Sequence, residues 1–238
     1  MIPKTIHYCW FGINKKSRLI EKCIESWHRY CPDYEIIEWN EDNFDINICP
    51  YVTQAYEQKK WAYVSDYARF YILNEYGGIY LDTDVELLKP LDDLLENDSF
   101  AGFASDDIVA TGLIFACNKN NWLCKSVIES YDGEEFVWDN PDKILAIGRR
   151  VTKILTDNGL KTDGTMQTVN STVIYPKEYF NPTDGDMRIK ASDKAYSVHH
   201  YAATWFPAHK RFFNSIKRFI GSKNMKKYYS LKDKITGK

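Results

Sequence analysis

The sequence lacks any hydrophobic run long enough to cross a membrane, and no apolar segment of the signal-peptide kind follows Met1. Its six cysteines form no Cys-x-x-Cys pair and no cysteine–histidine spacing typical of a zinc site. Internal repeats and low-complexity linkers are also missing. These absences argue against a membrane-spanning protein and a structural zinc module, and we expect a cytosolic protein with reduced thiols.

The composition is that of a globular protein. The 238 residues are 44% hydrophobic and 15% aromatic, which is sufficient for one large domain with a buried core. Tyrosine (17) and tryptophan (7) are abundant, and such rings often line sugar and base sites, although we expect most of them to pack in the core.

Charge is unevenly distributed along the chain. Residues 209–238 contain ten of the 31 Lys and Arg but one of the 33 acids, so residues 1–208 are strongly acidic. We therefore predict a domain over 1–208 that does not bind nucleic acid, followed by a basic tail over 209–238. Apolar residues at helical spacing in this tail alternate with Lys and Arg, which is typical of a helix on an anionic membrane surface, here the inner face of the membrane. A helix packed on the domain, or a tail that binds nucleic acid, are the alternatives.

Hydrophobic periodicity predicts alternating strands and helices. A buried strand over 5–11, an amphipathic helix over 17–30 and a strand over 34–39 form a βαβ opening. A long helix over 52–76 then ends at two glycines. Further strands are predicted over 79–88, 99–105, 112–117, 172–176 and 195–201, with helices from 121 and over 142–156. This pattern predicts an α/β fold with a mixed, mostly parallel sheet.

Two Asp-x-Asp sequences occur, and one of them has an informative context. Asp82-Thr83-Asp84 follows a buried strand pattern, whereas Asp184-Gly185-Asp186 lies in a turn-like segment. If the strand stays regular, the carboxylates of Asp82 and Asp84 point to the same side. At the carboxyl end of a strand they could hold Mn²⁺ or Mg²⁺ and, through the ion, a diphosphate. The alternative is a solvated acidic strand end.

A second charged pair, Asp66 and Arg69, precedes this motif on a predicted helix. The two residues are three apart and so share a helical face among aromatic neighbours. They could bind sugar hydroxyls and a phosphate, or they could form an ordinary surface ion pair.

These motifs together resemble a known family. The chain resembles the glycosyltransferase sugar-binding family with the Asp-x-Asp motif, of the family 32 type, at its start IPKTIHYCWFG and over the run SDYARFYILNEYGGIYLDTDVELLKPLDDLL. This family includes bacterial capsular polysaccharide transferases and yeast initiation mannosyltransferases. The resemblance implies the Rossmann-like GT-A fold of nucleotide-diphospho-sugar transferases. It also implies a nucleotide-sugar donor, an Mn²⁺ or Mg²⁺ ion and retention of the anomeric configuration.

The resemblance also assigns donor-binding residues near the motifs. Cys9 and Trp10 would hold the base, with Trp10 stacking on it, while Asp66 and Arg69 would bind the donor sugar and ribose. Asp82 would contact the ribose or metal-associated water, with Thr83 also at the donor and Asp84 as the direct metal ligand.

The resemblance extends weakly toward the C-terminus. His199-His200-Tyr201-Ala202-Ala203-Thr204-Trp205 is similar to the family's HH-x-x-x-S-W ending, with Thr204 in place of the usual serine. His200 or Thr204 would approach the metal, and Trp205 would contact the β-phosphate. Because neighbouring residues on a strand face opposite sides, one of the two histidines is expected to pack internally.

The predicted activity is the transfer of a hexose, from a UDP-sugar by resemblance, to a growing surface glycan such as a capsular polysaccharide or to a lipid-linked acceptor. No residue stands out as a general base, and Thr111-Gly112 and the segment 163–167 are the predicted acceptor-side elements. A metal-dependent nucleotidyltransferase or phosphodiesterase, which would need a third or fourth carboxylate nearby, is one alternative. A non-catalytic module that binds a nucleotide-sugar is the other.

Overall fold

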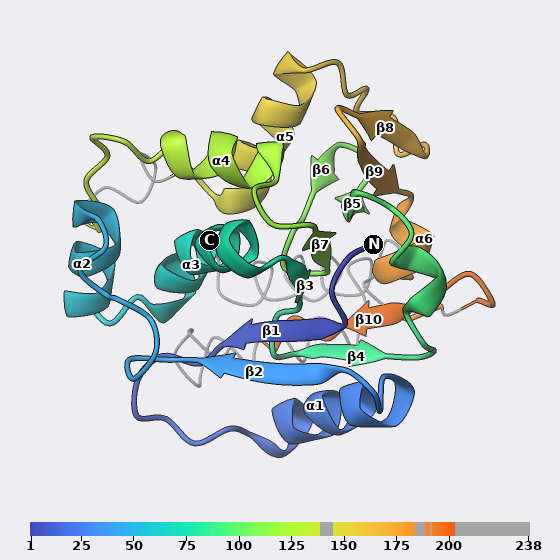
Figure 1. Ribbon diagram of the computed structural model, residues 1–238, viewed down its shortest axis with the longest axis horizontal. Helices are drawn as coiled ribbons and strands as arrows, with labels where there is room; N and C mark the ends of the chain where they lie inside the picture. Colours follow the sequence, from blue (N-terminus) through green and yellow to red (C-terminus); the bar gives the residue numbers. More distant parts are fainter. Residues whose placement is uncertain (139–144, 184–188, 191, 203–238) are drawn as a thin grey trace, which may run out of the picture.

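The computed structural model describes residues 1–138, 145–183, 189–190 and 192–202. Its centre is an eight-stranded sheet with the order β2-β1-β3-β7-β5-β9-β8, and β6 pairs with β5 (Figure 1). The sheet strands are β1 (Thr5–Cys9), β2 (Glu35–Trp39), β3 (Gly78–Tyr80), β5 (Ser99–Ser105), β6 (Ile108–Val109), β7 (Phe115–Cys117), β8 (Gln167–Val169) and β9 (Thr172–Tyr175). A second sheet pairs β4 (Val85–Leu87) with β10 (Ser197–His199) in antiparallel fashion.

Strand directions confirm the predicted α/β fold with a mixed sheet. β1 is parallel to β2 and β3, and β5 is parallel to β9. β7 lies between β3 and β5 and runs antiparallel to both, so the two parallel groups run in the same direction. Five of the eight strands therefore run one way, and β6, β7 and β8 run the other.

Helices cover both faces of the main sheet. The helices are α1 (Arg18–Tyr30), α2 (Pro50–Glu57), α3 (Trp61–Tyr76), α4 (Trp122–Glu129), α5 (Ile147–Asp157) and α6 (Lys177–Phe180), with a 3₁₀ turn η1 (Asp92–Leu94). α1 lies on one side, next to β4, and α3 with α4 lies on the other (Figure 1). None of the helices in the described part of the chain has the length and apolar character needed to cross a bilayer.

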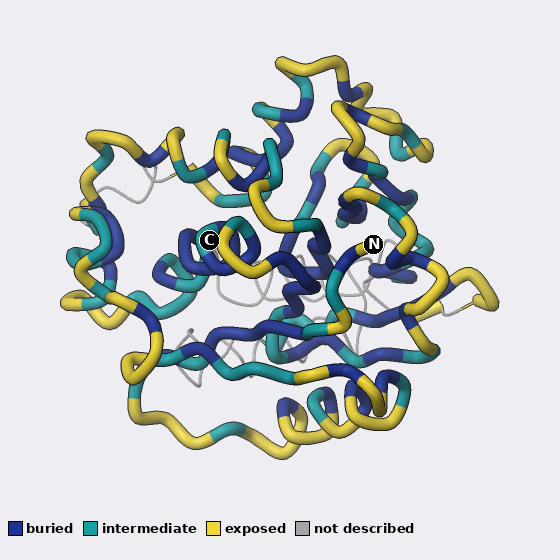
Figure 2. The backbone as a smooth tube through the Cα atoms, viewed as in Figure 1, coloured by how far each residue is buried: buried dark blue, intermediate teal, exposed yellow. Residues whose placement is uncertain are grey.

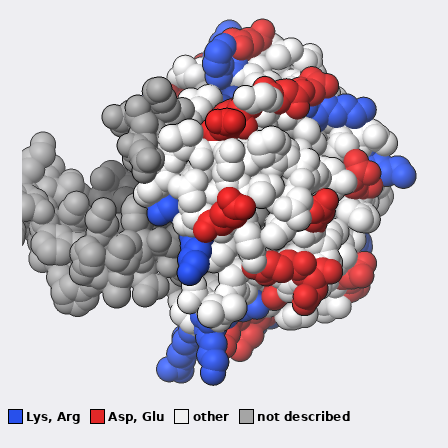
Figure 3. Space-filling view, turned by 90° about the vertical axis from the view of Figure 1, so that its left-hand side faces the viewer, with Lys and Arg blue, Asp and Glu red and all other residues white. Residues whose placement is uncertain are grey.

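The core consists of two apolar clusters, one on each face of the sheet. Along β1, Ile6 and Tyr8 pack in the cluster beside α1, while Cys9 packs in the cluster beside α3. A strand buried on both faces has apolar residues at nearly every position, and Figure 2 shows the central strands as mostly buried. The face shown in Figure 3 carries Asp and Glu side chains over its middle and Lys and Arg mainly toward its margins, which agrees with an acidic domain.

Helix α1 is a clear case of sequence dictating structure. The Ser17 side chain accepts from the N–H of Ile20 as the N-cap, and the buried face of the helix carries Ile20, Cys23 and Trp27. Trp27 Nε1 donates to the backbone carbonyl of Val85 at 2.8 Å, and Ser26 Oγ accepts from the N–H of Leu87 at 2.9 Å. The polar atoms of α1 thus hold β4, the strand that follows Asp84.

Two predicted elements are interrupted. The helix predicted over 52–76 is two helices, because Lys59 adopts a left-handed φ of 56° and the chain restarts as α3 at Trp61. The strand predicted over 79–88 is also two strands. After β3 the N–H of Asp82 bonds to the carbonyl of Gly112, a turn closes from Val85 N to Asp82 O, and β4 leaves the main sheet to pair with β10.

The two glycines after α3 meet a strict backbone requirement. Gly77 and Gly78 have φ values of 70° and 100°, in the region that side chains disfavour. A Cβ on Gly78 would lie 2.7 Å from the carbonyl oxygen of Thr5. Glycine therefore allows α3 to end and β3 to enter the sheet directly beside β1.

Some predictions fall outside the described residues. These are the basic tail over 209–238, the second Asp-x-Asp at Asp184 and Asp186, and the end of the predicted domain over 203–208. They remain predictions. The short elements β6, β8 and α6 were not predicted, because segments of two to four residues give no usable periodicity.

A buried histidine fixes the junction between β1, β2 and the glycine pair. Trp39 Nε1 donates to His7 Nδ1 at 3.1 Å, and since an indole N–H can only donate, the proton of the His7 ring is on Nε2. Nε2 then donates to the carbonyl of Gly77 at 3.0 Å. Burial lowers the pKa of His7 to about 4, and the hydrogen bond to Gly77 offsets this only partly.

This histidine should make stability fall in mild acid. The unfolded chain binds a proton at His7 below pH 6.5, whereas the folded chain does not accept one until about pH 4, so unfolding is favoured as the pH falls through this window. Between pH 7.5 and 5 we expect this group alone to lower the free energy of unfolding by about 2 kcal/mol.

Urea unfolding of the wild type, His7→Gln and His28→Gln at several pH values measures this contribution. His7→Gln should flatten the profile relative to the wild type, and His28→Gln, at an exposed histidine, is the control for loss of a histidine. A His7→Gln profile with the same slope as that of the wild type would contradict the assignment of a neutral, buried His7.

Candidate metal and donor site

A cavity of about 600 Å³ opens at the carboxyl ends of β1 and β3. One side is formed by Cys9, Trp10 and the following loop, and another by the first turns of α3. The turn after β3, the segment 110–113 and the end of β10 complete the wall. Ligands of α/β proteins bind at this edge of a sheet, so the cavity lies where the sequence predicted a site.

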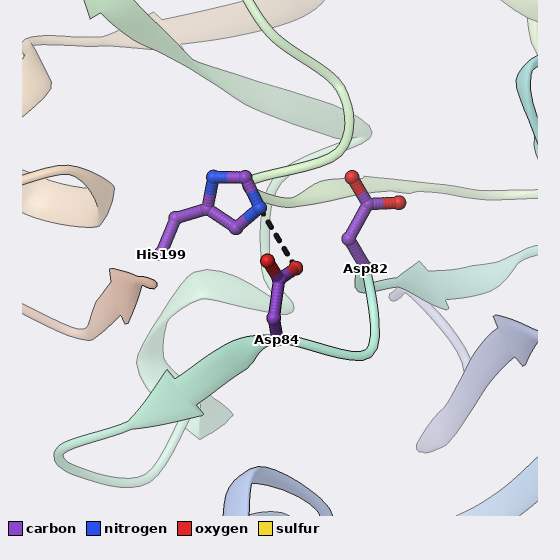
Figure 4. A group of neighbouring side chains, drawn as sticks. All are labelled: Asp82, Asp84 and His199. Atoms are coloured by element: carbon purple, nitrogen blue, oxygen red, sulfur yellow. Dashed lines mark hydrogen bonds and ion pairs between the residues drawn. The ribbon is translucent and has the colours of Figure 1, made fainter. Parts of the chain in front are cut away.

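Three side chains from two distant segments converge at this wall. Asp82, Asp84 and His199 each offer one ligand atom, and these atoms all lie within 4.8 Å of one another (Figure 4). We expected the two carboxylates to point to the same side if the strand stayed regular, but a turn between Asp82 and Asp84 interrupts it. The turn nevertheless brings both carboxylates to the same space, and His199 reaches it from β10.

A buried arginine ties α3 to this group. Arg69 donates to Asp66 at 2.7 Å and lies 3.3 Å from Asp82, and its side chain is only 4% exposed. Its Nε donates to the carbonyl of Ser65, and its guanidinium lies over the ring of Tyr80. The Asp66–Arg69 pair is thus no surface ion pair but part of a buried network that reaches the first Asp of the motif.

Burial and neighbouring charges shift the pKa values of Asp66 and Arg69 in this network. Burial raises the pKa of Asp66 to about 6, although the Arg69 charge opposes the shift. Burial would lower the pKa of Arg69, but the negative charges of Asp82 and Asp66 outweigh it, so the guanidinium stays charged. A permanently charged Arg69 therefore holds Asp66 and Asp82 together.

Asp84 is held by the segment at the end of β10. Its Oδ1 bonds to His199 Nε2 at 2.9 Å, and its Oδ2 accepts from the N–H of Ala202 at 2.6 Å. Burial would raise the pKa of Asp84, but the charge and hydrogen bond of His199 and the Ala202 N–H lower it to about 2. The carboxylate is therefore ionised at neutral pH, as a metal ligand must be.

The two adjacent histidines bond to different acids, and His200 is not the one beside the motif. The expectation that one of them packs internally is not met, because both are partly buried. His200 Nε2 bonds to Glu86 Oε2 at 2.7 Å, and His199 is the one that joins Asp82 and Asp84. The reason is register, because His199 pairs with Val85 across β4 and β10 and its ring points to the Asp84 side. The alternation of strand residues allowed either histidine beside the motif, and no local pattern distinguishes the two.

The predicted donor-binding residues at the N-terminal side also line the cavity. Trp10 is half-buried, its Nε1 donates to the carbonyl of Asn14, and Lys16 Nζ lies 5.3 Å from its ring centre. The thiol of Cys9 is buried, which raises its pKa to about 12, so it acts as an apolar contact and not as a nucleophile. Thr83 lines the wall between the two aspartates, whereas Thr204 and Trp205 lie outside the described residues.

Two further wall residues were missed or undervalued from the sequence. Trp61, the first residue of α3, lines the cavity and packs so closely on Gly12 that a Cβ there would lie 2.8 Å from the indole. Gly112 touches the motif itself, because a Cβ on it would lie 2.0 Å from Asp82 Oδ2. We had placed Gly112 on the acceptor side, and its contact shows only that it packs against Asp82.

The donor set suits a hard or borderline divalent ion. Two carboxylates and one imidazole within 4.8 Å would leave several coordination positions for phosphate oxygens and water. Imidazole also widens the choice toward transition metals such as Mn²⁺. The residues present therefore fit a divalent ion.

Comparison with known proteins confirms the predicted resemblance. Residues 17–101 match the family described as "Glycosyltransferase sugar-binding region containing DXD motif", a stretch that contains Asp66, Arg69, Asp82 and Asp84. The chain is 34% identical over 102 residues to "Inositol phosphoceramide mannosyltransferase 3" of Schizosaccharomyces pombe, covering 40% of this chain and 27% of that protein. It is 26% identical over 148 residues to "Mannosyl phosphorylinositol ceramide synthase SUR1" of Saccharomyces cerevisiae, covering 58% and 37%.

A solved structure confirms the predicted fold. The "PaToxG Glycosyltransferase" superposes with a TM-score of 0.52 at 19% identity, over 66% of this chain and 69% of that one. The chain thus has the GT-A fold, and its residues 17–101 are similar to the sugar-binding region of DXD glycosyltransferases. It spans well under half the length of the two fungal relatives.

The contact of Gly112 with Asp82 makes a testable prediction. In Gly112→Ala, the new methyl group should displace the Asp82 carboxylate and the Arg69 guanidinium, which would lie 3.0 Å away. Asp82 is 30% exposed and can swing outward, so we expect the protein to fold but to bind a divalent ion at least tenfold more weakly.

Gly148→Ala in α5 is the matched control, because its new Cβ would meet Ile108 at 3.1 Å and the carbonyl of Val109 at 3.4 Å, and neither belongs to the motif. Titration with Mn²⁺, followed by the EPR signal of the free ion, measures both variants. Equal Mn²⁺ affinity of Gly112→Ala and the wild type would show that Asp82 does not take part in binding the ion.

Proposed function

We propose that this DXD glycosyltransferase transfers a hexose from a nucleotide-sugar, with a divalent ion, to a glycan or lipid-linked acceptor with retention of configuration. The observation that carries the proposal is the convergence of Asp82, Asp84 and His199 on a cavity wall next to the Asp66–Arg69 pair. The match over residues 17–101 supports the same activity.

The ion would be held by Asp84 and His199, with Asp82 as a direct or water-mediated ligand. When bound, it neutralises negative charge on the leaving diphosphate and so eases cleavage of the sugar–phosphate bond. The imidazole in the donor set favours Mn²⁺ over Mg²⁺ in this proposal. Thr204, by resemblance to the family ending, would lie near the same ion.

The donor would lie across the cavity, from Trp10 at one side to the Asp66–Arg69 pair at the other. Trp10 would stack on the base, and its indole is already fixed by Asn14 and Lys16. Asp66 would accept hydrogen bonds from hydroxyls of the donor sugar, while Arg69 keeps the Asp66 carboxylate in place. In this arrangement the buried arginine acts mainly by positioning two carboxylates.

Retention of configuration is proposed from the family resemblance and agrees with the charges of the cavity. Among the described residues of its wall, the carboxylates are Asp66, Asp82 and Asp84, and each is bonded to Arg69 or His199. No free carboxylate is therefore poised as a general base. The bond from the sugar C1 to the diphosphate would break as the acceptor oxygen bonds to C1 on the same face, and the acceptor proton would pass to the departing diphosphate oxygen.

The donor and acceptor are proposed at the level of chemical class. UDP-hexose is the donor that the family resemblance favours, and a GDP-sugar is the second candidate because the two fungal relatives are named as mannosyltransferase or mannosyl-adding enzymes. Those relatives' names specify an inositol phosphoceramide acceptor, which supports a lipid-linked acceptor here. A growing surface glycan such as a capsular polysaccharide is the other acceptor class.

The alternatives make different demands on the site. A two-metal nucleotidyltransferase would need carboxylates that are free to bind a second ion, but Asp66 is engaged by Arg69. A non-catalytic binding module would bind the donor without turnover. Transfer and binding must therefore be measured on the same samples.

Asp84→Asn provides the sharpest test. The amide keeps the shape and can still accept from the N–H of Ala202, but it removes the charge that the ion requires. In a thermal-shift panel of UDP-hexoses and GDP-mannose with Mn²⁺ or EDTA, the wild type should gain several degrees with one donor plus Mn²⁺, because a ligand at 100 times its Kd stabilises by about 2.7 kcal/mol. Asp84→Asn should lose this gain and its transfer activity.

Asp42→Asn is the matched control, since Asp42 is exposed and distant in sequence from the motif. It should behave as the wild type. Donor-induced stabilisation without Mn²⁺, unchanged in Asp84→Asn, would rule out the metal assignment. Hydrolysis of a donor to a nucleoside monophosphate would favour the nucleotidyltransferase or phosphodiesterase instead.

Membrane association remains a proposal from the basic tail. We expect deletion of 209–238, which removes ten Lys and Arg, to release the protein from vesicles containing phosphatidylserine. Co-sedimentation at low and high salt measures this, with phosphatidylcholine vesicles as control. Equal binding before and after the deletion would exclude the tail as the anchor at the inner membrane face.

A further inference from the structure

We infer that Tyr201 is a positioning residue for the metal site, acting on His199 and Asp84; this inference rests on the proposed function. The family ending HH-x-x-x-S-W leaves position 201 unspecified, so the resemblance gives it no role.

The backbone at Tyr201 has an unusual conformation. Its φ is 47°, a left-handed value that is rare for an aromatic residue and is often found at functional sites. Immediately before it, the N–H of His200 still bonds to the carbonyl of Asp84 at 2.9 Å, which continues the pairing of β10 with β4. Immediately after it, the N–H of Ala202 bonds to Asp84 Oδ2 at 2.6 Å.

The left-handed turn thus changes which part of Asp84 the chain binds. A regular strand would carry the chain past Asp84 along β4, and the N–H of Ala202 would not reach the side chain. With the turn, the segment 199–202 binds the carbonyl and both carboxylate oxygens of Asp84. A hydrogen bond to an ionised carboxylate is a strong one, and it offsets the strain at Tyr201.

The ring of Tyr201 completes the arrangement. Its centre lies 4.1 Å from the centre of the His199 ring, at an interplanar angle of 63°, and Tyr201 also lines the cavity. His199 is therefore held by Asp84 through Nε2 and by Tyr201 through ring contact. A histidine that binds a metal needs its ring orientation fixed, and residues that do this typically change metal affinity 10–100-fold.

Three variants separate the ring from the backbone. Tyr201→Phe keeps the ring. Tyr201→Asn and Tyr201→Gly remove it but tolerate a left-handed φ, so the turn to Ala202 can still form. If the asparagine variant does not fold, the glycine variant keeps the comparison open. Asp84→Asn is the reference for loss of the ion site.

The measurement is Mn²⁺ affinity by EPR without donor, together with the unfolding midpoint in EDTA. We expect Tyr201→Phe to stay within about twofold of the wild type and Tyr201→Asn or Tyr201→Gly to bind Mn²⁺ at least tenfold more weakly. Their transfer activity should recover at saturating Mn²⁺, whereas that of Asp84→Asn should not. A structural role alone would lower the midpoint in EDTA without a rescue by Mn²⁺.

The outcomes distinguish this inference from the proposed function. If the wild type and Tyr201→Asn bind Mn²⁺ equally, Tyr201 does not position the site, and the glycosyltransferase proposal stands. If the wild type shows neither Mn²⁺ binding nor metal-dependent transfer, the metal proposal and this inference both fail. Weaker binding without rescue by excess Mn²⁺ would also overturn the positioning role.

Discussion

The arrangement of the site depends on the ion pairs that the buried guanidinium of Arg69 forms with Asp66 and Asp82. Arg69 joins the third helix to the end of β3 by bonding Asp66 on its own helix and approaching Asp82 after the strand. A charge that is 4% exposed is tolerated only with partners close by, and here two carboxylates provide them. The lack of a side chain at Gly112 leaves room for this cluster. Removal of Arg69 would leave the carboxylates of Asp66 and Asp82 without their common cationic partner.

The second half of the motif depends on a different set of contacts. Asp84 lies beyond the turn, where the chain leaves the main sheet, and it is fixed by β10 from more than a hundred residues away. β4 is in turn fixed by α1, because Trp27 and Ser26 bond to its backbone. The group of Asp82, Asp84 and His199 therefore joins the main sheet, through Asp82, to the small sheet, through Asp84 and His199. A shift between the two sheets would separate the three side chains.

Much of this could be predicted from local patterns, and the failures have physical causes. The βαβ opening and the glycine stop were predicted correctly, because periodicity and positive φ are local properties. The run from residue 79 to 88 reads as one strand because its apolar residues continue, and only tertiary pairing with Gly112 and β10 breaks it. The choice between His199 and His200 depends on the register of two strands that are far apart in sequence, which no local pattern encodes. Gly112 was visible as a glycine, but its contact with Asp82 exists only in three dimensions.

The charges of the cavity also bear on the order in which ligands enter the proposed site. The described charged residues of its wall are Lys15, Asp66, Arg69, Asp82 and Asp84, so negative charge exceeds positive by one unit when His199 is neutral. A diphosphate would be repelled by the two motif aspartates in the absence of a cation, since both lie where its oxygens would bind. A divalent ion reverses the sign of the local charge, and the same carboxylates then attract the donor through it. The donor is thus expected to bind together with or after the ion. Before the ion arrives, Arg69 holds Asp82, and His199 with the N–H of Ala202 holds Asp84.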